Sequence, residues 1–571
     1  MNYSIKLHNP LTHFIAVELT LTCSSDKVDL YLPMWRPGRY EAANYAKNVR
    51  DFTVTSTDGT KVKYIKTSPS SWELYAKTGS KLIVSYNYFA FQMDAGNSYY
   101  DTEQLYINFI NCLMYDIDQM DQSCQVDIAL PEGYEIACGL KQNGNTLIAK
   151  DYYELVDSPM IASKSLQHYS YDVDEIDFHI WIQGECQIDR EKLVGDFKKF
   201  SEVQVKMLDG FPESSYHFLI HALPYKFYHG VEHHDSTVIC LGPGHLLETE
   251  ELYSQLLGVS SHELFHSWNI IRIRPKELMP YQFNEPVFFP TGFVAEGFTT
   301  YYGDLFLSRG GVFDTSAYFA ELNTLFKRHF LNFGRRNYSV YNSSLDLWID
   351  GYALSTPDRK SSIYVEGAMV ALCLDMMIRQ KWDDKKSLDD VVKQLWINYG
   401  KTNVGYTYED IIKLCEEVYE GDLQKFFDDH VAGTEDKTYL ISELLQHVGC
   451  RLTKKPSESD LEKYFGMRLA DPNGTFKITQ IAPNSPAEQY FSINDVVVTI
   501  NGKNIEMENI NQFDAGTFDF KIMRGNREME ITLATGEAEY FSQYIIEPLS
   551  LLSTKQKSSF KAWTGCILEA L

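Results

Sequence analysis

The chain has 571 residues, a formal net charge of −26 at pH 7 and a sequence pI of about 5.0. A chain of this length exceeds what one hydrophobic core can serve, so we expect about three or four domains. The acidity argues against nucleic acid and membrane as partners, because both are bound through basic surfaces. Hydrophobic residues make up 44% of the chain, which argues against long disordered segments.

The N-terminal residues show no basic segment followed by an apolar run, and no later stretch approaches the roughly 18 consecutive apolar residues of a membrane span. We therefore expect a cytoplasmic protein without a signal peptide or transmembrane segment. The ten cysteines are scattered without a Cys-x-x-Cys pair, which is typical of reduced, mostly buried thiols.

Apolar and polar residues alternate in the first part of the chain, as in 17–21 and 28–32. This period of two predicts half-buried strands, and an antiparallel β-sandwich or saddle domain over residues 1–175. The segment 32–40, LPMWRPGRY, is too rich in proline and glycine to be a strand interior. Its composition favours a packed structural corner, with a position at the substrate edge as the alternative.

Helical spacing of apolar residues begins near Leu193, and we expect helices to dominate from about residue 189 to about residue 450. Ser387 and Thr407 each precede a carboxylate by three residues, ahead of an apolar periodic run, which predicts two capped helix starts. Residues 176–455 should form a mostly helical domain.

The segment 262–266 reads His-Glu-Leu-Phe-His. Histidines four residues apart lie on one face of a helix, so His262 and His266 can bind the same Zn²⁺. Glu263, between them, would face the open coordination position. A chance match on an ordinary helix is the alternative interpretation.

A catalytic zinc site needs a third protein ligand and an open position for water. Glu296 lies 30 residues beyond His266, near the start of a second predicted helix that follows a proline-rich turn. Glu277 and Glu285 lie within that turn and are rival ligands. We predict one Zn²⁺ per chain, with Glu263 as general base toward a zinc-bound water and then as general acid toward the departing amine.

Four blocks of the sequence resemble, in order and spacing, the glycyl aminopeptidase family of zinc metallopeptidases. They are HELFHSWNIIRIRPKEL, EGFTTYYGDLFLSRGG, SSLDLWI (343–349) and YVEGAMVALCLDMMIR (364–379). The segment LPMWRPGRY resembles that family's N-terminal domain, so the resemblance covers nearly the whole chain. It implies a thermolysin-like catalytic domain of the gluzincin type, Glu296 as third zinc ligand and aminopeptidase activity on peptides.

The resemblance also implies two further site residues. Related zinc aminopeptidases bind the oxyanion through the tyrosine of a Tyr-x-Lys-Gly motif, which Tyr364 matches, with Glu366 in place of the lysine. Ile271 likewise stands where the family usually has lysine. A glutamate upstream of the zinc helix pairs with the substrate's α-ammonium in those enzymes, and Glu232 in the segment 230–233 fits this role.

Two features also have a structural interpretation, without a role in substrate binding. The segment around Glu232 could be a surface loop between strands. Arg272 and Arg274 are expected to be ion-paired residues at a helix end and not clamps for a substrate carboxylate.

Short strands return near residue 455. The segments 465–469, 481–488 and 494–502 resemble the carboxylate-binding loop, the Ser-Pro-Ala turn and a following strand of a PDZ domain. We expect a PDZ-like domain over residues 456–540, which could bind a peptide C-terminus or pack on the catalytic domain. Residues 541–571 are predicted to dock on the catalytic domain.

The predicted fold is multidomain α+β, with an N-terminal antiparallel β domain, a thermolysin-like helical domain and a PDZ-like domain. The predicted function is removal of small N-terminal residues, glycine or alanine, from peptides. A zinc endopeptidase is one alternative, and a catalytically silent PDZ-bearing peptide-binding protein is another.

Overall fold

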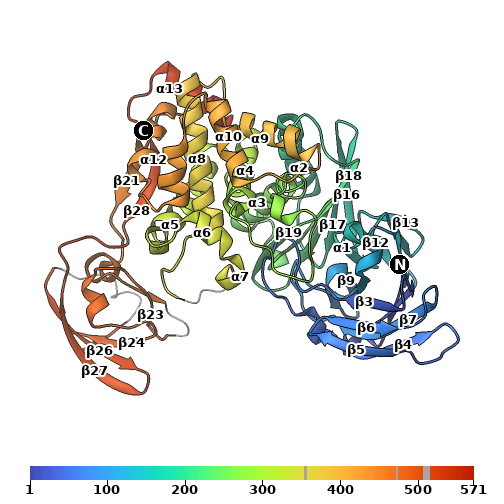
Figure 1. Cartoon of the computed structure of the whole chain (residues 1–571). Helices are drawn as coiled ribbons and strands as arrows, with labels where there is room; N and C mark the ends of the chain where they lie inside the picture. The colour runs from blue at the N-terminus through green and yellow to red at the C-terminus, as the bar shows by residue number, and fades with distance from the viewer. Residues whose placement is uncertain (353–355, 471–473, 506–514, 571) are drawn as a thin grey trace. The chain divides into compact units, whose positions relative to one another are not determined.

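The structure is a computed structural model that describes residues 1–352, 356–470, 474–505 and 515–570. The chain forms two compact units (Figure 1). The first comprises Met1–Phe313, Ser344–Tyr352 and Asp389–Cys415, and the second comprises Asp314–Ser343, Ala353–Leu388 and Glu416–Leu571. The predicted division into four domains remains a prediction.

The N-terminal part of the first unit is rich in β-structure, as predicted. In β2 (Phe14–Thr22) and β7 (Lys81–Phe89), buried residues alternate with more exposed ones, as expected for strands with one face on a core. These strands pair antiparallel within a seven-stranded sheet. Its spatial order is β13 (Lys141–Asn143), β14 (Thr146–Ala149), β11 (Cys124–Ala129), β1 (Asn2–Leu7), β2, β7 and β4 (Val49–Ser56).

Two four-stranded sheets complete this part. One has the order β10 (Tyr115–Asp116), β3 (Lys27–Tyr31), β6 (Ser71–Tyr75) and β5 (Lys63–Ser68). The other has the order β12 (Glu135–Ala137), β15 (Met160–Ser163), β9 (Gln104–Ile107) and β8 (Tyr99–Tyr100). The short helix α1 (Tyr152–Val156) lies between β14 and β15 in the chain. The segment 32–40 follows β3 as a loop in which Trp35 and Tyr40 are buried.

A five-stranded sheet follows, and for residues 215–242 the expectation that helices dominate is wrong. Its order is β16 (Gln167–Val173), β17 (Ile176–Gln183), β18 (Ser215–Ala222), β20 (Ser236–Gly242) and β19 (Phe227–Glu232). β18 runs parallel to both of its neighbours, and β20 is buried along its whole length. Strands covered on both faces lose the alternation by which a strand is identified in a sequence.

Helices dominate after β20, and one helix, α2 (Arg190–Met207), already precedes β18. After β20, α3 (Glu250–Phe265) packs on β19 and β20 and contacts α4 (Thr299–Arg309). A π-helical turn, η7 (Phe293–Phe298), leads directly into α4. α9 (Leu388–Leu395) and α10 (Tyr408–Tyr419) begin immediately after Ser387 and Thr407, as predicted.

The second unit contains most of the remaining helices. They are α5 (Thr315–Phe330), α6 (Val340–Leu345), α8 (Ile363–Trp382), α11 (Gln424–Phe427) and α12 (Thr438–Leu445), with α7 (Leu347–Asp350) belonging to the first unit. Near the C-terminus, β28 (Gln543–Pro548) pairs with β21 (Cys450–Lys455), and Trp563 of α13 (Thr554–Thr564) packs edge-on against Tyr318. No helix within the described ranges has both the length and the apolar character needed to cross a membrane.

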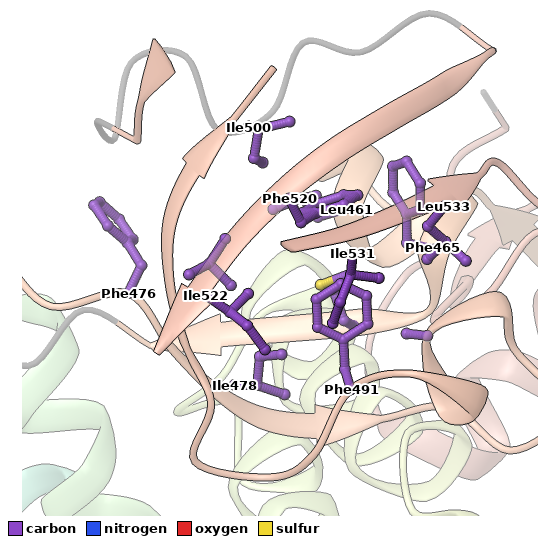
Figure 2. Close-up of a cluster of buried hydrophobic side chains, with 13 residues drawn as sticks. Leu461, Phe465, Phe476, Ile478, Phe491, Ile500, Phe520, Ile522, Ile531 and Leu533 are labelled. Carbon is purple, nitrogen blue, oxygen red and sulfur yellow. The ribbon is translucent and has the colours of Figure 1, made fainter. Parts of the chain in front are cut away.

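The second unit also contains a C-terminal antiparallel sheet, as predicted. Its order is β22 (Met467–Ala470), β23 (Lys477–Ile481), β24 (Val496–Ile500), β26 (Thr517–Arg524) and β27 (Arg527–Ala534), with β25 (Lys503–Asn504) paired to β24. Figure 2 shows its apolar core, in which Phe465 and Phe491 pack edge-on against Phe520.

Candidate active site

Helix α3 carries both predicted histidine ligands. Thr249 caps its first turn by accepting a hydrogen bond from the Leu252 amide, and the helix ends next to His266. His262 and His266 lie one turn apart, with their Nε2 atoms 3.0 Å from each other. The Nδ1 atom of His266 donates to the Asn269 carbonyl at 2.5 Å, which leaves the Nε2 lone pair free to bind a metal.

The π-helical turn η7 supplies the third predicted ligand. Glu296 is buried, and its Oε2 lies 3.4 Å from His266 Nε2 and 3.7 Å from His262 Nε2. Ligand atoms of a tetrahedral Zn²⁺ lie about 3.4 Å apart, given bond lengths of about 2.0–2.2 Å. These three residues can therefore hold one metal ion. π-helical turns often occur at functional sites, because the extra residue redirects side chains.

Glu263 projects from α3 beside these ligands. It is 5% exposed, and its Oε2 has no hydrogen-bond partner among the described residues. Gly230 of β19 makes room for it, because a Cβ at this position would overlap the Glu263 carboxylate. Burial raises the pKa of Glu263 well above its usual value, with Glu232 and Glu296 adding to the rise. A carboxylate with a raised pKa is suited to accept and return a proton.

Glu232, the last residue of β19, belongs to the same cluster. One of its oxygens, one of Glu263 and a nitrogen of His266 lie within 4.8 Å of one another. Glu232 is 6% exposed, and its Oε1 has no hydrogen-bond partner in the described part of the chain. Burial raises its pKa, while the charges of His266 and Arg36 act in the opposite direction. The residue is therefore part of a strand beside the histidines, and not of a surface loop.

The cluster as a whole carries an excess of carboxylates. Burial opposes the charge on Glu296, yet His266 and His262 outweigh it and lower the Glu296 pKa to about 2. The same contacts raise the pKa of His266 to about 10 against the effect of its burial. Three buried carboxyl groups around two imidazoles suit a bound cation, and within the described part of the chain Glu232 Oε1 and Glu263 Oε2 have no hydrogen-bond partner.

The loop 32–40 contributes to the site, although its composition favoured a structural corner. Trp35 fits that expectation, since it is buried and donates to the Gln282 carbonyl at 2.8 Å. Gly38, however, has φ of +77°, and a Cβ there would lie 2.6 Å from Oε2 of Glu232. The glycine therefore allows the loop to touch the carboxylate.

Sequence reasoning missed two neighbours of this cluster, Arg36 and Tyr352. Tyr352 accepts a hydrogen bond from the Tyr40 amide at 3.0 Å. Burial raises the pKa of Tyr352, and the charges of Glu296 and Arg36 also act on it. The lone arginine between Trp35 and Pro37 was the available sequence signal, whereas nothing marked Tyr352.

Tyr364 is the second residue of α8 and lies in the second unit. In the same turn, Glu366 is buried and replaces the family's usual lysine. Its Oε1 lies 2.5 Å from Lys437 Nζ, and its Oε2 lies 2.8 Å from His329 Nδ1. Glu366 is thus paired within the second unit by Lys437 and His329. Ile271, where the family usually has a lysine, is 2% exposed.

The rival ligands and the two arginines lie elsewhere. Glu277 and Glu285 are exposed, and neither belongs to a group of described residues that could hold a metal. Arg272 forms an ion pair with Glu213, and Arg274 stacks on the ring of Tyr281 at 4.0 Å.

Two family models match the chain. The Peptidase M61 N-terminal domain matches residues 2–164, and the M61 glycyl aminopeptidase model matches residues 255–370. The second match includes the histidine motif, Glu296 and Tyr364. In a comparison with curated proteins, no sequence matches the chain significantly.

One solved structure shares the fold, and a second is less similar. An aminopeptidase N family protein from Idiomarina loihiensis superposes with a TM-score of 0.90 at 24% identity, covering 99% of each chain. An M1 zinc metallopeptidase from Deinococcus radiodurans has a TM-score of 0.47 at 12% identity, covering 76% of this chain and 93% of the other. The two family matches give the chain an M61 N-terminal domain and an M61 glycyl aminopeptidase domain, and together with the ligand geometry they identify it as a metallopeptidase.

Proposed function

We propose that the chain is a zinc-dependent aminopeptidase that hydrolyses the first peptide bond of peptides with small N-terminal residues, glycine or alanine. The observation that carries the proposal is the convergence of His262, His266 and Glu296 beside two buried glutamates with unpartnered oxygens. The name of the matched family supports the preference for small residues.

The donor set suits zinc. Two imidazole nitrogens and one carboxylate form the ligand set of gluzincin-type sites and leave one position open. A bound Zn²⁺ would lower the pKa of water and polarise the substrate carbonyl. The His266 ring is already oriented for this task by its hydrogen bond to the Asn269 carbonyl.

The remaining chemistry belongs to the protein's own side chains. Glu263 takes the proton of the attacking water and passes it to the departing amine. Glu232 binds the substrate's α-ammonium through its unpartnered oxygen, which sets the cleaved bond one residue from the free end. Tyr364 is proposed as the donor to the oxyanion, on the basis of the family's motif.

A substitution at the proposed base tests the function. Glu263→Gln keeps the shape of the side chain but cannot accept a proton, so we expect kcat to fall by a factor of about 10²–10⁴. Zinc content, measured by atomic spectroscopy, should stay at one ion per chain. Glu251→Gln, the same change in the exposed first turn of α3, is the matched control and should leave kcat unchanged. A protein without zinc, or unchanged cleavage by Glu263→Gln, would contradict the proposal.

For residues 456–540 we propose a PDZ-like module that packs within its own unit. The support is a small antiparallel sheet with its own apolar core, together with the contacts of Ala482 and Phe541 with Phe333. Gln480 also donates to the Leu331 carbonyl at 3.0 Å. These contacts favour packing over free display of a peptide-binding groove.

A further inference from the structure

A cationic pocket of about 250 Å³ lies in the first unit, in part of the chain that also contacts the glutamate cluster. Arg36, Arg39 and Lys47 line it, with Glu41 as the one acidic lining residue and Asn97 and Gln92 as neutral ones. Glu41 forms an ion pair with Arg39 at 2.5 Å. Two of the three cations remain without a carboxylate from the lining, in a chain whose net charge is −26.

Arg36 is the buried member of this set, with 4% of its surface exposed. Among the described residues, no carboxylate oxygen lies within the 4.0 Å of an ion pair with it. Its Nη1 donates to the Pro37 carbonyl at 3.0 Å, which uses one of five N–H groups. A buried guanidinium that forms no ion pair is costly, so its presence in this pocket points to a ligand.

The neighbouring residues hold this guanidinium in place without neutralising it. A Cβ at Gly96 would overlap it, so the glycine provides the space that it occupies. Asp94, the nearby acid on the same loop, already accepts hydrogen bonds from the Gly96 amide and from the side chains of Gln92 and Asn97. Its oxygens are therefore committed within the loop.

The pocket is close to the catalytic groups. Gly38, which touches Glu232, is two residues from Arg36, a backbone separation of at most about 7 Å. A short peptide held at its ammonium by Glu232 can therefore place a second charged group at Arg36.

We propose that Arg36 is a specificity-determining residue that binds a carboxylate group of the peptide substrate, an inference that rests on the proposed aminopeptidase function. A planar guanidinium binds a carboxylate through two parallel hydrogen bonds, and more strongly than it binds a neutral acceptor. The carboxylate has two possible sources in a peptide. One is the C-terminus of a short peptide, and the other is an acidic side chain next to the cleaved bond.

Three peptides of equal length separate these sources. They are Ala-Ala-Ala with a free C-terminus, Ala-Ala-Ala amide, and Ala-Glu-Ala amide. We expect the wild-type protein to prefer at least one carboxylate-bearing peptide over Ala-Ala-Ala amide by about 10- to 100-fold in kcat/KM, since charged hydrogen bonds have this strength. Preference for the free acid indicates the C-terminus, and preference for Ala-Glu-Ala amide indicates the side chain.

Arg36→Met should remove this preference, so that within this variant kcat/KM for the two carboxylate-bearing peptides falls to the value for Ala-Ala-Ala amide. Arg36→Lys keeps the charge but not the two parallel donors, so it should keep only part of the preference and serves if Arg36→Met does not fold. Arg50→Met, an exposed arginine packed on Phe14, makes the same charge change elsewhere and should keep the full preference.

Binding of the same peptides in the Glu263→Gln background separates this inference from the proposed function. If substitution of Arg36 removes the tighter binding of carboxylate-bearing peptides, the proposed role of Arg36 is supported even if the wild-type protein cleaves no peptide. Equal affinity and equal kcat/KM for the three peptides in the wild type, or an equal loss for all three in Arg36→Met, would overturn it.

Discussion

Each unit of the molecule contains a buried ionic cluster, and the two clusters are built in opposite ways. In the first unit, Glu232, Glu263 and Glu296 surround two histidines, and two of the carboxylate oxygens have no hydrogen-bond partner among the residues that the structure describes. In the second unit, Glu366 has partners for both oxygens, Lys437 and His329. The first cluster has three carboxyl groups for two imidazoles, whereas the second pairs one carboxylate with one lysine and one histidine.

This difference separates a binding site from a structural ion pair. Buried charges are tolerated in folded proteins when they are paired, and an unpaired one usually has a ligand or a shifted pKa. On the proposed function, a metal ion and the substrate's ammonium would bind to the first cluster. The second needs neither, so its replacement should affect stability without affecting metal binding.

The largest effect should follow from removing one partner of the Glu366–Lys437 ion pair in the second unit. Lys437→Met leaves Glu366 buried without its cation, and removing one partner of a buried pair costs about 3–5 kcal/mol of unfolding free energy. Urea denaturation measures this loss, and zinc content should not change. Adding Glu366→Gln should recover most of the loss, because no unpaired charge remains. A purely local loss of packing would instead persist in the double variant.

The next effect concerns metal binding by the cluster in the first unit that contains Glu296. Zinc at 100 times its Kd should stabilise the wild-type protein by about 2.7 kcal/mol. In Glu296→Gln the affinity should fall by more than about 100-fold, because even residues that only support metal ligands contribute that much. The zinc-dependent shift in urea denaturation should then shrink to about 0.4 kcal/mol or less. Glu285→Gln, at the exposed rival position, should keep the full zinc-dependent shift. If Glu285→Gln loses that shift, Glu285 and not Glu296 is the third ligand.

A smaller effect is expected at Glu232, the proposed binding residue for the substrate's α-ammonium. Glu232→Gln should lower kcat/KM for a peptide with a free amine by about 10- to 100-fold, the strength of a charged hydrogen bond. The wild-type protein should not cleave the same peptide after N-acetylation. Efficient cleavage of the acetylated peptide would favour the zinc endopeptidase instead.

The smallest effect is the pH dependence of the stability that the Glu366–Lys437 pair contributes. Burial would raise the Glu366 pKa, but His329 and Lys437 outweigh it and hold the pKa below its usual value. The stability that this carboxylate contributes is therefore present above the unfolded pKa of about 4.3 and is lost only as the pH falls below it. Lys437→Met should raise that pKa, so its cost should be roughly 1 kcal/mol smaller at pH 5.0 than at pH 7.5. An equal cost at both pH values would mean that Lys437→Met does not change the pKa of Glu366.

Local patterns were sufficient for part of this description. The four-residue spacing of His262 and His266 predicted one helical face, and Ser387 and Thr407 predicted two helix starts that the structure has. Alternation in 17–21 predicted a strand with one buried face. These features depend only on neighbours within about one turn or one strand, which the sequence displays directly.

Features that depend on distant residues were not accessible in this way. β18 and β20 were missed because both are covered on two faces and lack alternation. Lys437 meets Glu366 across 71 residues of chain, and no local pattern pairs them. Arg36 was visible only as one residue of a proline-rich loop, and its closeness to Glu232 follows from the folded path of that loop.

The π-helical turn at Phe293–Phe298 determines which insertions and deletions the site can accept. Successive residues of a helix are rotated by about 100°, so one residue more or fewer before Glu296 would turn its carboxylate away from the histidines. The same change would leave the sequence of α4 intact and helical. The position of Glu296 within this turn is therefore fixed relative to α4, while surface loops elsewhere can vary in length.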